Sequence, residues 1–224
     1  MSEKEELLAH ISEIKSHLVD KQAFFPYNYN AIFVWSGIAL FLTLFMVSMY
    51  EQSIVIGSLG TAFVMGVGFV SEGIMTKRVN RDYDIEDCTL RQRFIMQTFL
   101  MLSLFLIVLS ATLAIYKLYI PIYLTWLFLI SMGFFALGFV LNIKAFMNLA
   151  RFNVTLSIFM LGMGWYQEHL VGSDSICFRI VQAVLIVGLT ILPSLIAWKL
   201  KKGTLGVWSA AASKYPLQTG FAVD

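Results

Sequence analysis

Glu72 has the clearest potential for chemistry in this sequence, because it is the only acid within the apolar part of any long hydrophobic run. It lies near the end of the run 54–76. A carboxylate at membrane depth is costly unless it is paired, hydrated or protonated. One hypothesis is a proton-binding or cation-binding carboxylate that faces the interior of a helical bundle. The alternative is that Glu72 extends toward Lys77 and Arg78 and pairs with them at the membrane surface.

Three further residues could contribute to such a site. Asn142 lies at the end of the fourth run, and Thr190 and Pro193 lie in the sixth. Pro193 follows Gly188, which predicts a kink and a backbone carbonyl without its helical partner. Such kinks line cavities in transporters, and they also occur in plain helical bundles. Glu72, Asn142, Thr190 and Pro193 are therefore the candidate residues for binding an ion or a substrate.

A second group of polar residues lies outside the apolar runs, on a predicted helix over 2–21 and in the loop 77–93. The residues concerned are His10, Glu13, Asp82, Asp84 and Glu86. They could dock a cytoplasmic or membrane partner. The alternative is that they are solvated charges and that the acids of the loop balance its arginines.

The sequence predicts no metal site and no cofactor. His10 and His17 would lie about 10.5 Å apart along a helix axis, too far to share one ion at about 2.1 Å. The acidic loop has Asp87 and Arg93 where a calcium loop requires a glycine and a final acid. No histidine lies in the interior of any run, so haem has no pair of ligands within the bilayer. No nucleophile and base can be assembled at one depth, so the sequence argues against an enzyme.

Helices of membrane length must position these residues. Each of the six runs has about 20 to 25 residues, enough to cross a hydrocarbon core of about 30 Å. The second run carries Ser58, Ala62 and Gly66 at every fourth position, with Gly57, Gly60, Gly68 and Gly73 beside them, which predicts a central helix with close neighbours. The fifth run is the weakest span because its apolar part ends near Tyr166. The predicted spans are 30–50, 54–76, 94–116, 120–143, 152–171 and 176–200.

Composition places the chain in a lipid bilayer. Hydrophobic residues make up 58% and charged residues only 13%, against about 25% charged in soluble domains. The net charge of +2, without interleaved basic and aromatic residues, argues against nucleic-acid binding. We predict an all-α, polytopic integral membrane protein with three parts. These are a cytoplasmic amphipathic helix and aromatic interface segment (1–29), a six-helix transmembrane domain (30–202) and a cytoplasmic tail (203–224).

The distribution of Lys and Arg predicts the orientation of the chain. With six crossings, Lys117 and Arg179 lie on one side, and the other 14 of the 16 basic residues lie on the opposite side. Basic residues concentrate on the cytoplasmic side of membrane proteins. We therefore expect a multi-pass protein of the cell (inner) membrane with both termini cytoplasmic. Cys88 is then internal and Cys177 external.

Two functions remain open at this point. The first is a small transporter or channel for an ion or small solute, acting as a homo-oligomer or in a membrane complex, because six helices leave little interior in one protomer. The second is a non-catalytic scaffold or sensor subunit that docks a partner through the N-terminal helix and the loop 77–93. The two differ in whether Glu72 or the polar surface residues matter for activity.

Overall fold

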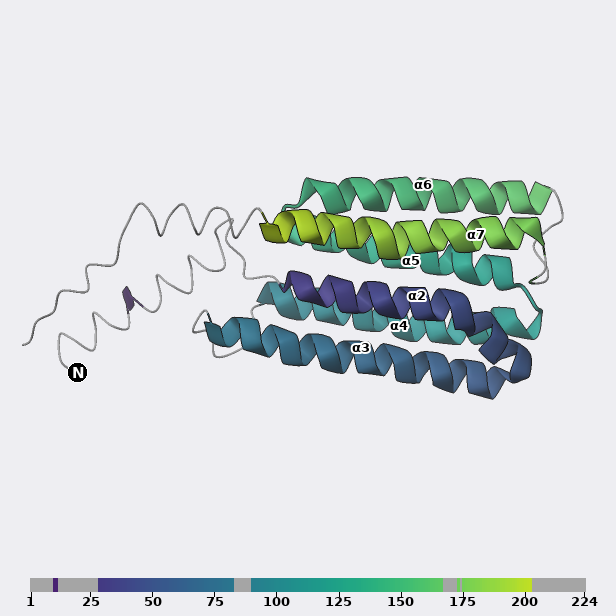
Figure 1. Cartoon of the computed structure of the whole chain (residues 1–224), viewed down its shortest axis with the longest axis horizontal. Coiled ribbons are helices and arrows are strands. Elements are labelled where there is room, and N and C mark those ends of the chain that lie inside the picture. The colour runs from purple at the N-terminus through teal and green to yellow at the C-terminus, as the bar shows by residue number, and fades with distance from the viewer. Residues whose placement is uncertain (1–9, 12–27, 83–89, 167–172, 174, 203–224) are drawn as a thin grey trace, which may run out of the picture.

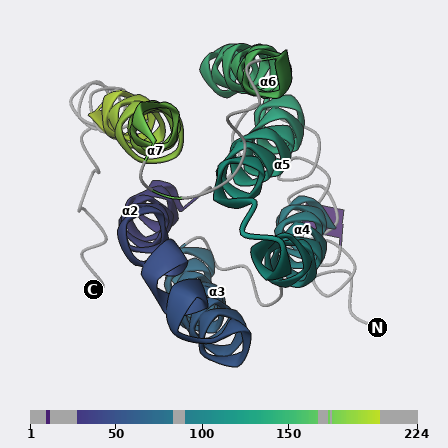
Figure 2. The same ribbon diagram turned by 90° about the vertical axis from the view of Figure 1, so that its right-hand side faces the viewer.

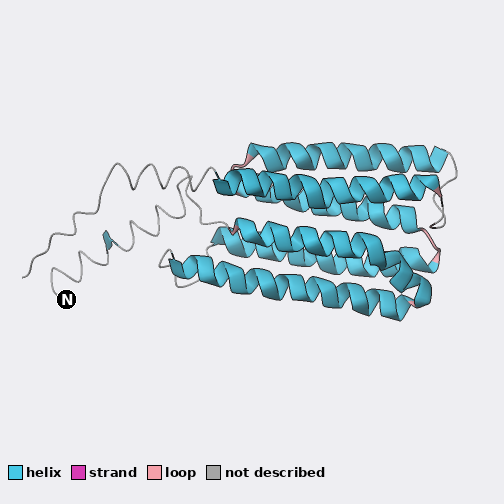
Figure 3. Cartoon of the chain, viewed as in Figure 1, coloured by secondary structure: helices cyan, strands magenta, loops and turns pink. Residues whose placement is uncertain are grey.

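The computed structural model is an antiparallel bundle of long helices (Figure 1). It describes residues 10–11, 28–82, 90–166, 173 and 175–202. Helices and short connecting turns account for this described part (Figure 3). Six of the helices are long and apolar enough to cross a membrane. The predicted all-α fold with six spans is therefore confirmed, and the chain is a polytopic membrane protein.

The last span changes its helical pitch partway along. It begins as α7, passes through a π-helical segment, η1, and continues as helix to Lys202. The five spans before it are regular α-helices. The elements are α2 (Tyr29–Gln52), α3 (Ile54–Asp82), α4 (Leu90–Ile115), α5 (Tyr119–Val140), α6 (Lys144–Tyr166), α7 (Ile176–Ile186) and η1 (Val187–Ile191).

Several helices extend beyond the predicted apolar runs. α6 begins at Lys144 and not at residue 152, and α3 continues past residue 76 to Asp82. Backbone hydrogen bonding continues into the charged ends, which hydropathy does not register. Arg151 is accommodated in α6 because its guanidinium lies over the Phe135 ring, 5.8 Å from the centroid. The fifth span thus gains at its start the length that its apolar part lacks at its end.

The helices pack as a ring with one helix outside it. α2 contacts α3 and α7, α4 lies between α3 and α5, and α5 also contacts α7. α6 packs mainly against α5, on the outside of the ring (Figure 2). α5 is the most enclosed span, because 56% of its most apolar stretch is buried, against 22% for that of α3. The prediction that the second run is central is therefore wrong.

Three glycines of α3 explain how it nevertheless packs closely on α2. A side chain at Gly57 would overlap the Tyr50 ring, and Gly60 and Gly68 face Met49 and Trp35 in the same way. The prediction of close packing is thus confirmed for these three glycines, but it is wrong for two members of the row with one small residue in every four. Ala62 and Gly66 are exposed, and no atom lies within 4 Å of a Cβ placed at Gly66.

The outward faces of the bundle are apolar. Large side chains such as Phe63 (73% exposed), Met101 (73%) and Val108 (67%) lie on the surface. Such a surface matches lipid and not water. It follows that the polar groups which remain inside are the ones to examine for function.

The start of α2 and the end of the last span lie at the same end of the bundle (Figure 1). Lys201, near the end of the last span, donates a hydrogen bond to Asn30 at the start of α2 (2.9 Å). Most basic residues of the described part lie at this end, which we call the basic end. They are Lys77, Arg78, Arg81, Arg91, Arg93, Lys144, Arg151, Lys199, Lys201 and Lys202.

Candidate functional site: a buried carboxyl and three hollows along one helix

Glu72 faces the inside of the bundle. Its side chain is only 7% exposed, and its Oε2 accepts a hydrogen bond of 2.7 Å from the indole Nε1 of Trp35 on α2. Lys77 and Arg78, the alternative partners, are exposed. Among the described residues, the indole is the hydrogen-bond partner of this carboxyl, and no basic side chain pairs with it.

Trp35 is held over α3 by two neighbours. Gly68 leaves room for the six-membered ring, because a Cβ there would lie 2.8 Å from Trp35 Cη2. The Phe69 ring packs edge-on against the indole, with centroids 4.9 Å apart. Gly68 and Glu72 are four residues apart, so they lie on the same face of α3. The Trp35 ring therefore packs on the turn of α3 that contains Gly68, and its N–H bonds to Glu72 on the next turn.

Further buried polar side chains surround Glu72 near the basic end. We call Asn28, Glu72, Thr76, Asn80 and Gln92 the polar cluster; each is 7% exposed or less. Asn80 and Gln92 exchange two amide hydrogen bonds of 3.0 and 2.7 Å between α3 and α4. These bonds satisfy both side-chain amides in the interior.

Asn28 is only partly satisfied. Its Oδ1 caps α2 by accepting from the backbone N–H of Asn30 (3.2 Å), but its Nδ2 has no partner among the described residues. Asn28, Glu72, Thr76 and Gln92 line a pocket of about 10 Å³ together with two apolar residues of α4. That volume is about the size of one water-sized group. A buried donor therefore faces a small polar pocket that also contains the carboxyl.

The structure does not bring Asn142 into this pocket. Asn142 follows α5 in an exposed turn with φ of 54°, a left-handed conformation that asparagine tolerates better than most residues. The side chains that line the pocket come instead from α3, α4 and the residue that caps α2. Sequence reasoning missed Trp35, Asn28 and Gln92, because only the fold shows which helices face Glu72.

Thr190 and Pro193 lie at the π-helical segment of the last span. Leu192 donates its N–H to the Val187 carbonyl, a bond across five residues. The next such bond would run from Pro193 to Gly188, and proline has no N–H to donate. The predicted free carbonyl is therefore that of Gly188. The Nδ2 of Asn153, a fully buried residue of α6, donates to it at 3.1 Å.

A close approach makes this bond between helices possible. A Cβ at Gly188 would lie 2.9 Å from Asn153 Oδ1. In the sequence, Asn153 matches a glycosylation sequon with Thr155, a signal that its predicted cytoplasmic position rules out, and nothing there indicates a contact with the last span. Thr190 is half-buried, and its hydroxyl has no partner in the part of the chain that the structure describes.

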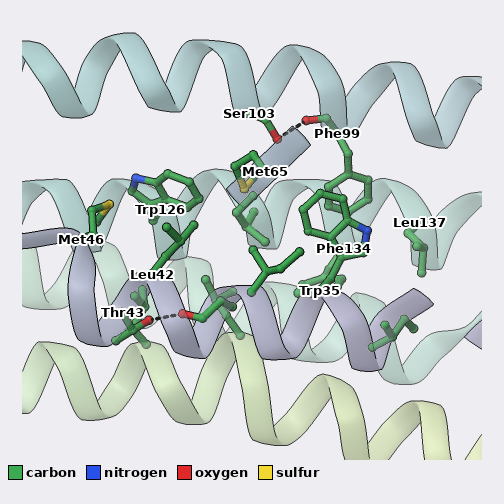
Figure 4. A pocket seen from close by; sticks show the side chains of 16 residues that line it. Trp35, Leu42, Thr43, Met46, Met65, Phe99, Ser103, Trp126, Phe134 and Leu137 are labelled. Carbon is green, nitrogen blue, oxygen red and sulfur yellow. Dashed lines mark hydrogen bonds between the residues drawn. The ribbon is translucent and has the colours of Figure 1, made fainter. Parts of the chain in front are cut away.

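A separate apolar cavity of about 60 Å³ lies deeper in the bundle, between α2 and α5 (Figure 4). Its few hydroxyl groups are turned away to backbone carbonyls. Thr43 donates to Ala39 (2.6 Å) and Ser103 to Phe99 (2.7 Å). Its principal lining residues from α2 and α5 are Ile32, Trp35, Ala39, Met46, Trp126 and Phe134.

A third hollow opens at the end of the bundle opposite the basic end. Its volume is about 670 Å³, and its lining includes Tyr50, Glu51 and Lys117. Glu51 accepts a hydrogen bond from the hydroxyl of Ser173 (2.9 Å). We call this hollow the vestibule. Its lining is about half polar, in contrast to the almost entirely apolar lining of the cavity.

One stripe of α2 lines all three hollows in order. Asn28 borders the polar pocket, Ile32 to Met46 border the apolar cavity, and Tyr50 borders the vestibule. The stripe recurs every three or four residues, the spacing of one helix face. Its members are Asn28, Ile32, Trp35, Ala39, Thr43, Met46 and Tyr50.

α2 is anchored near its middle by two side chains. The backbone carbonyl of Thr43 accepts hydrogen bonds from the Tyr123 hydroxyl on α5 (2.6 Å) and from Gln182 Nε2 on α7 (2.9 Å). Tyr123 is completely buried. Three helices therefore meet at one backbone oxygen, a contact that spacing along the chain does not reveal.

Most of the predicted docking residues lie outside the described part of the chain. This holds for Glu13, Asp84 and Glu86. His10 is helical and exposed, and Asp82 is the last residue of α3. Within the described residues, no group of three His, Cys, Asp or Glu side chains could hold a metal ion.

Comparisons with protein-family models, with curated proteins and with solved structures found no match to this chain.

Proposed function

We propose that this protein is a small transporter that moves a small solute or ion along the inner stripe of α2, with Glu72 as its polar binding group. The supporting observation is the order of the three hollows. A polar pocket at one end and a polar vestibule at the other lie on either side of an apolar cavity, and a single helix face borders them all.

The apolar middle favours a carrier over an open channel. A hydrated ion loses its water ligands in an apolar constriction and is excluded from it. The cavity of about 60 Å³ is small. Passage would therefore need movement of α2 relative to α5 and α7, which is the usual behaviour of carriers whose bundles rock about a central site.

We further propose that the protein acts as an oligomer in the cell membrane with its basic end in the cytoplasm. The limited interior of one protomer supports the first part. The concentration of basic residues at one end supports the second.

Substitution of Glu72 by Gln tests the role of the carboxyl. Gln keeps the shape of the side chain and an oxygen that can accept from Trp35, so the variant removes the charge with little change in packing. In proteoliposomes we expect flux to fall at least about tenfold, the effect of about 1.4 kcal/mol. The fluxes measured are those of protons, Na⁺, K⁺ and a panel of radiolabelled amines, acids and alcohols.

Thr98→Val is the matched control. Thr98 lies on the lipid-facing side of α4 and bonds only to the Phe94 carbonyl of its own helix (2.9 Å). This variant should transport as the unsubstituted protein does. Equal fluxes of every solute in Glu72→Gln and the unsubstituted protein would remove the carboxyl from the mechanism and with it the proposal.

The docking function through the N-terminal helix and the loop 77–93 stays a prediction. Its test is deletion of residues 2–21, followed by purification in mild detergent. Loss of a co-purifying partner from an otherwise folded bundle would support it.

A further inference from the structure

Trp35 links a residue that lines the polar pocket to the wall of the apolar cavity. Its indole ring lines the apolar cavity (Figure 4), while its N–H donates to the Glu72 carboxyl, which lines the polar pocket. A molecule with a polar head and an apolar chain could therefore occupy both spaces by lying along one side chain.

The depths of the two spaces match those of a lipid molecule. Glu72 precedes Lys77 by five residues, or about 7.5 Å of helix, so the pocket lies near the charged basic end. Thr43 and Met46, which line the apolar cavity, lie in the middle and second half of α2. A lipid places its head near the membrane surface and its chain inward in the same way.

The donors and acceptors of the pocket select the chemistry of the head. The Nδ2 of Asn28 has no acceptor among the described residues, and the Glu72 carboxylate, which already accepts from Trp35, can accept from a second donor. A hydroxyl group supplies both. An ammonium group has no acceptor for Asn28, and a carboxylate would meet Glu72 with the same charge. The pocket of about 10 Å³ also admits only one small group.

The cavity selects the chain. Its lining is aliphatic and aromatic, and the hydroxyls of Thr43 and Ser103 are already bonded to backbone carbonyls. Apolar cavities of this kind stay dry and bind hydrocarbon. At about 10–15 Å³ for each water-sized group, the cavity holds on the order of five methylene groups.

We propose that the polar pocket and the apolar cavity form one binding site for a single-chain alcohol. The hydroxyl lies between Asn28 and Glu72, and the alkyl chain runs past Trp35 between α2 and α5. This inference rests on the proposed function in that it names the class of substrate. Binding, however, can be measured without transport.

The test is photolabelling of the full-length protein in nanodiscs with a six-carbon alcohol that carries a diazirine in its chain. Labelled positions are mapped by mass spectrometry. We expect labels on α2 and α5 residues that line the cavity. Unlabelled 1-hexanol should compete at least about tenfold better than hexane, the factor expected for two ordinary hydrogen bonds. Hexylamine and hexanoate should compete less well than hexanol.

Two variants address the two halves of the site. Asn28→Asp keeps the capping oxygen of α2 but loses the donor, so it should lower the preference for hexanol over hexane by the contribution of one of the two hydrogen bonds. Ala39→Phe fills the cavity and should abolish the labelling of its lining. Ala62→Phe adds the same ring on the exposed face of α3 and should leave labelling unchanged. If Ala39→Phe fails to fold, Ser103→Leu fills the cavity from α4.

Each outcome separates this inference from the proposed function. Equal competition by hexanol and hexane, or unchanged labelling in the folded cavity-filled variant, would overturn the site. If flux of some other solute still depended on Glu72, the transporter would stand with a different substrate. Specific labelling with no flux of any solute would keep the site and overturn transport.

Discussion

The hydrogen bond from Trp35 to Glu72 shows how one residue can depend on a glycine in the neighbouring turn. The carboxyl is buried, so losing its donor would leave an unsatisfied polar group within the bundle. The donor is in place because Gly68 lets the indole lie against α3. Gly66, only two residues away, has no such neighbour.

Gly68→Ala should therefore displace the Trp35 ring and weaken its bond to Glu72. We expect destabilisation of about 1–3 kcal/mol from overpacking, measured by SDS titration of the purified protein. A shift in tryptophan emission should accompany it. Gly66→Ala is the matched control, and it should be neutral or stabilising by up to about 1 kcal/mol because alanine favours helix. Equal effects of the two substitutions would contradict the role assigned to Gly68.

At the scale of single residues, the sequence singled out Glu72 but did not predict the side chains around it. Glu72 stands out because it is a carboxyl among apolar residues. Its donor lies 37 positions earlier in the chain, and Asn28 and Gln92 lie on other segments. Their proximity follows from which helices are neighbours, and local spacing carries no information about that. Asn142 was a candidate binding residue because it is polar, but in the structure it forms part of the turn after α5.

The last span shows how an element can be irregular without losing its hydrogen bonds. The π-helical segment ends where Pro193 lacks the N–H that Gly188 would use, and Asn153 supplies a donor from α6. A helix that packs outside the ring is thereby tied to a helix within it. The predicted kink thus takes the form of a change in helical pitch with an external partner.

A double-mutant cycle tests this exchange of donors. Asn153→Ala alone should cost about 0.6–1.7 kcal/mol, the range for hydrogen bonds between membrane helices. In a Pro193→Ala background the restored N–H can donate to Gly188, so the same substitution should cost less. Unfolding in SDS of the four proteins gives the coupling. Strict additivity would show that Asn153 and Pro193 do not act on the same carbonyl.

The existence of the six spans could be predicted from hydropathy, whereas their ends could not. Apolar length marks the part of a helix within the hydrocarbon. Lys144 and Arg151 lie on α6 but outside that apolar stretch, so hydropathy missed its first two turns. The central position predicted for α3 was also wrong, because small residues allow close packing without showing which face of the helix is used.

For the whole molecule, the separation of charge between the two ends predicts an orientation. Single cysteines at Gln52 and Arg78, both exposed and at opposite ends of the bundle, test it in a background where Cys88 and Cys177 are Ser. A membrane-impermeant maleimide should label Gln52→Cys in intact cells. It should label Arg78→Cys only after the membrane is permeabilised. The reverse pattern would invert the orientation.

The meeting of three helices at the Thr43 carbonyl has a mechanical consequence. Tyr123 and Gln182 fix α2 at this point, while the polar pocket lies toward its beginning and the vestibule toward its end. A rigid helix that is held near its centre can tilt only about that point. Tilting of α2 about this point would widen the polar pocket as it narrows the vestibule, or the reverse, so the two could not be open together. In the transport proposed above, this contact at one oxygen atom would make the two openings alternate.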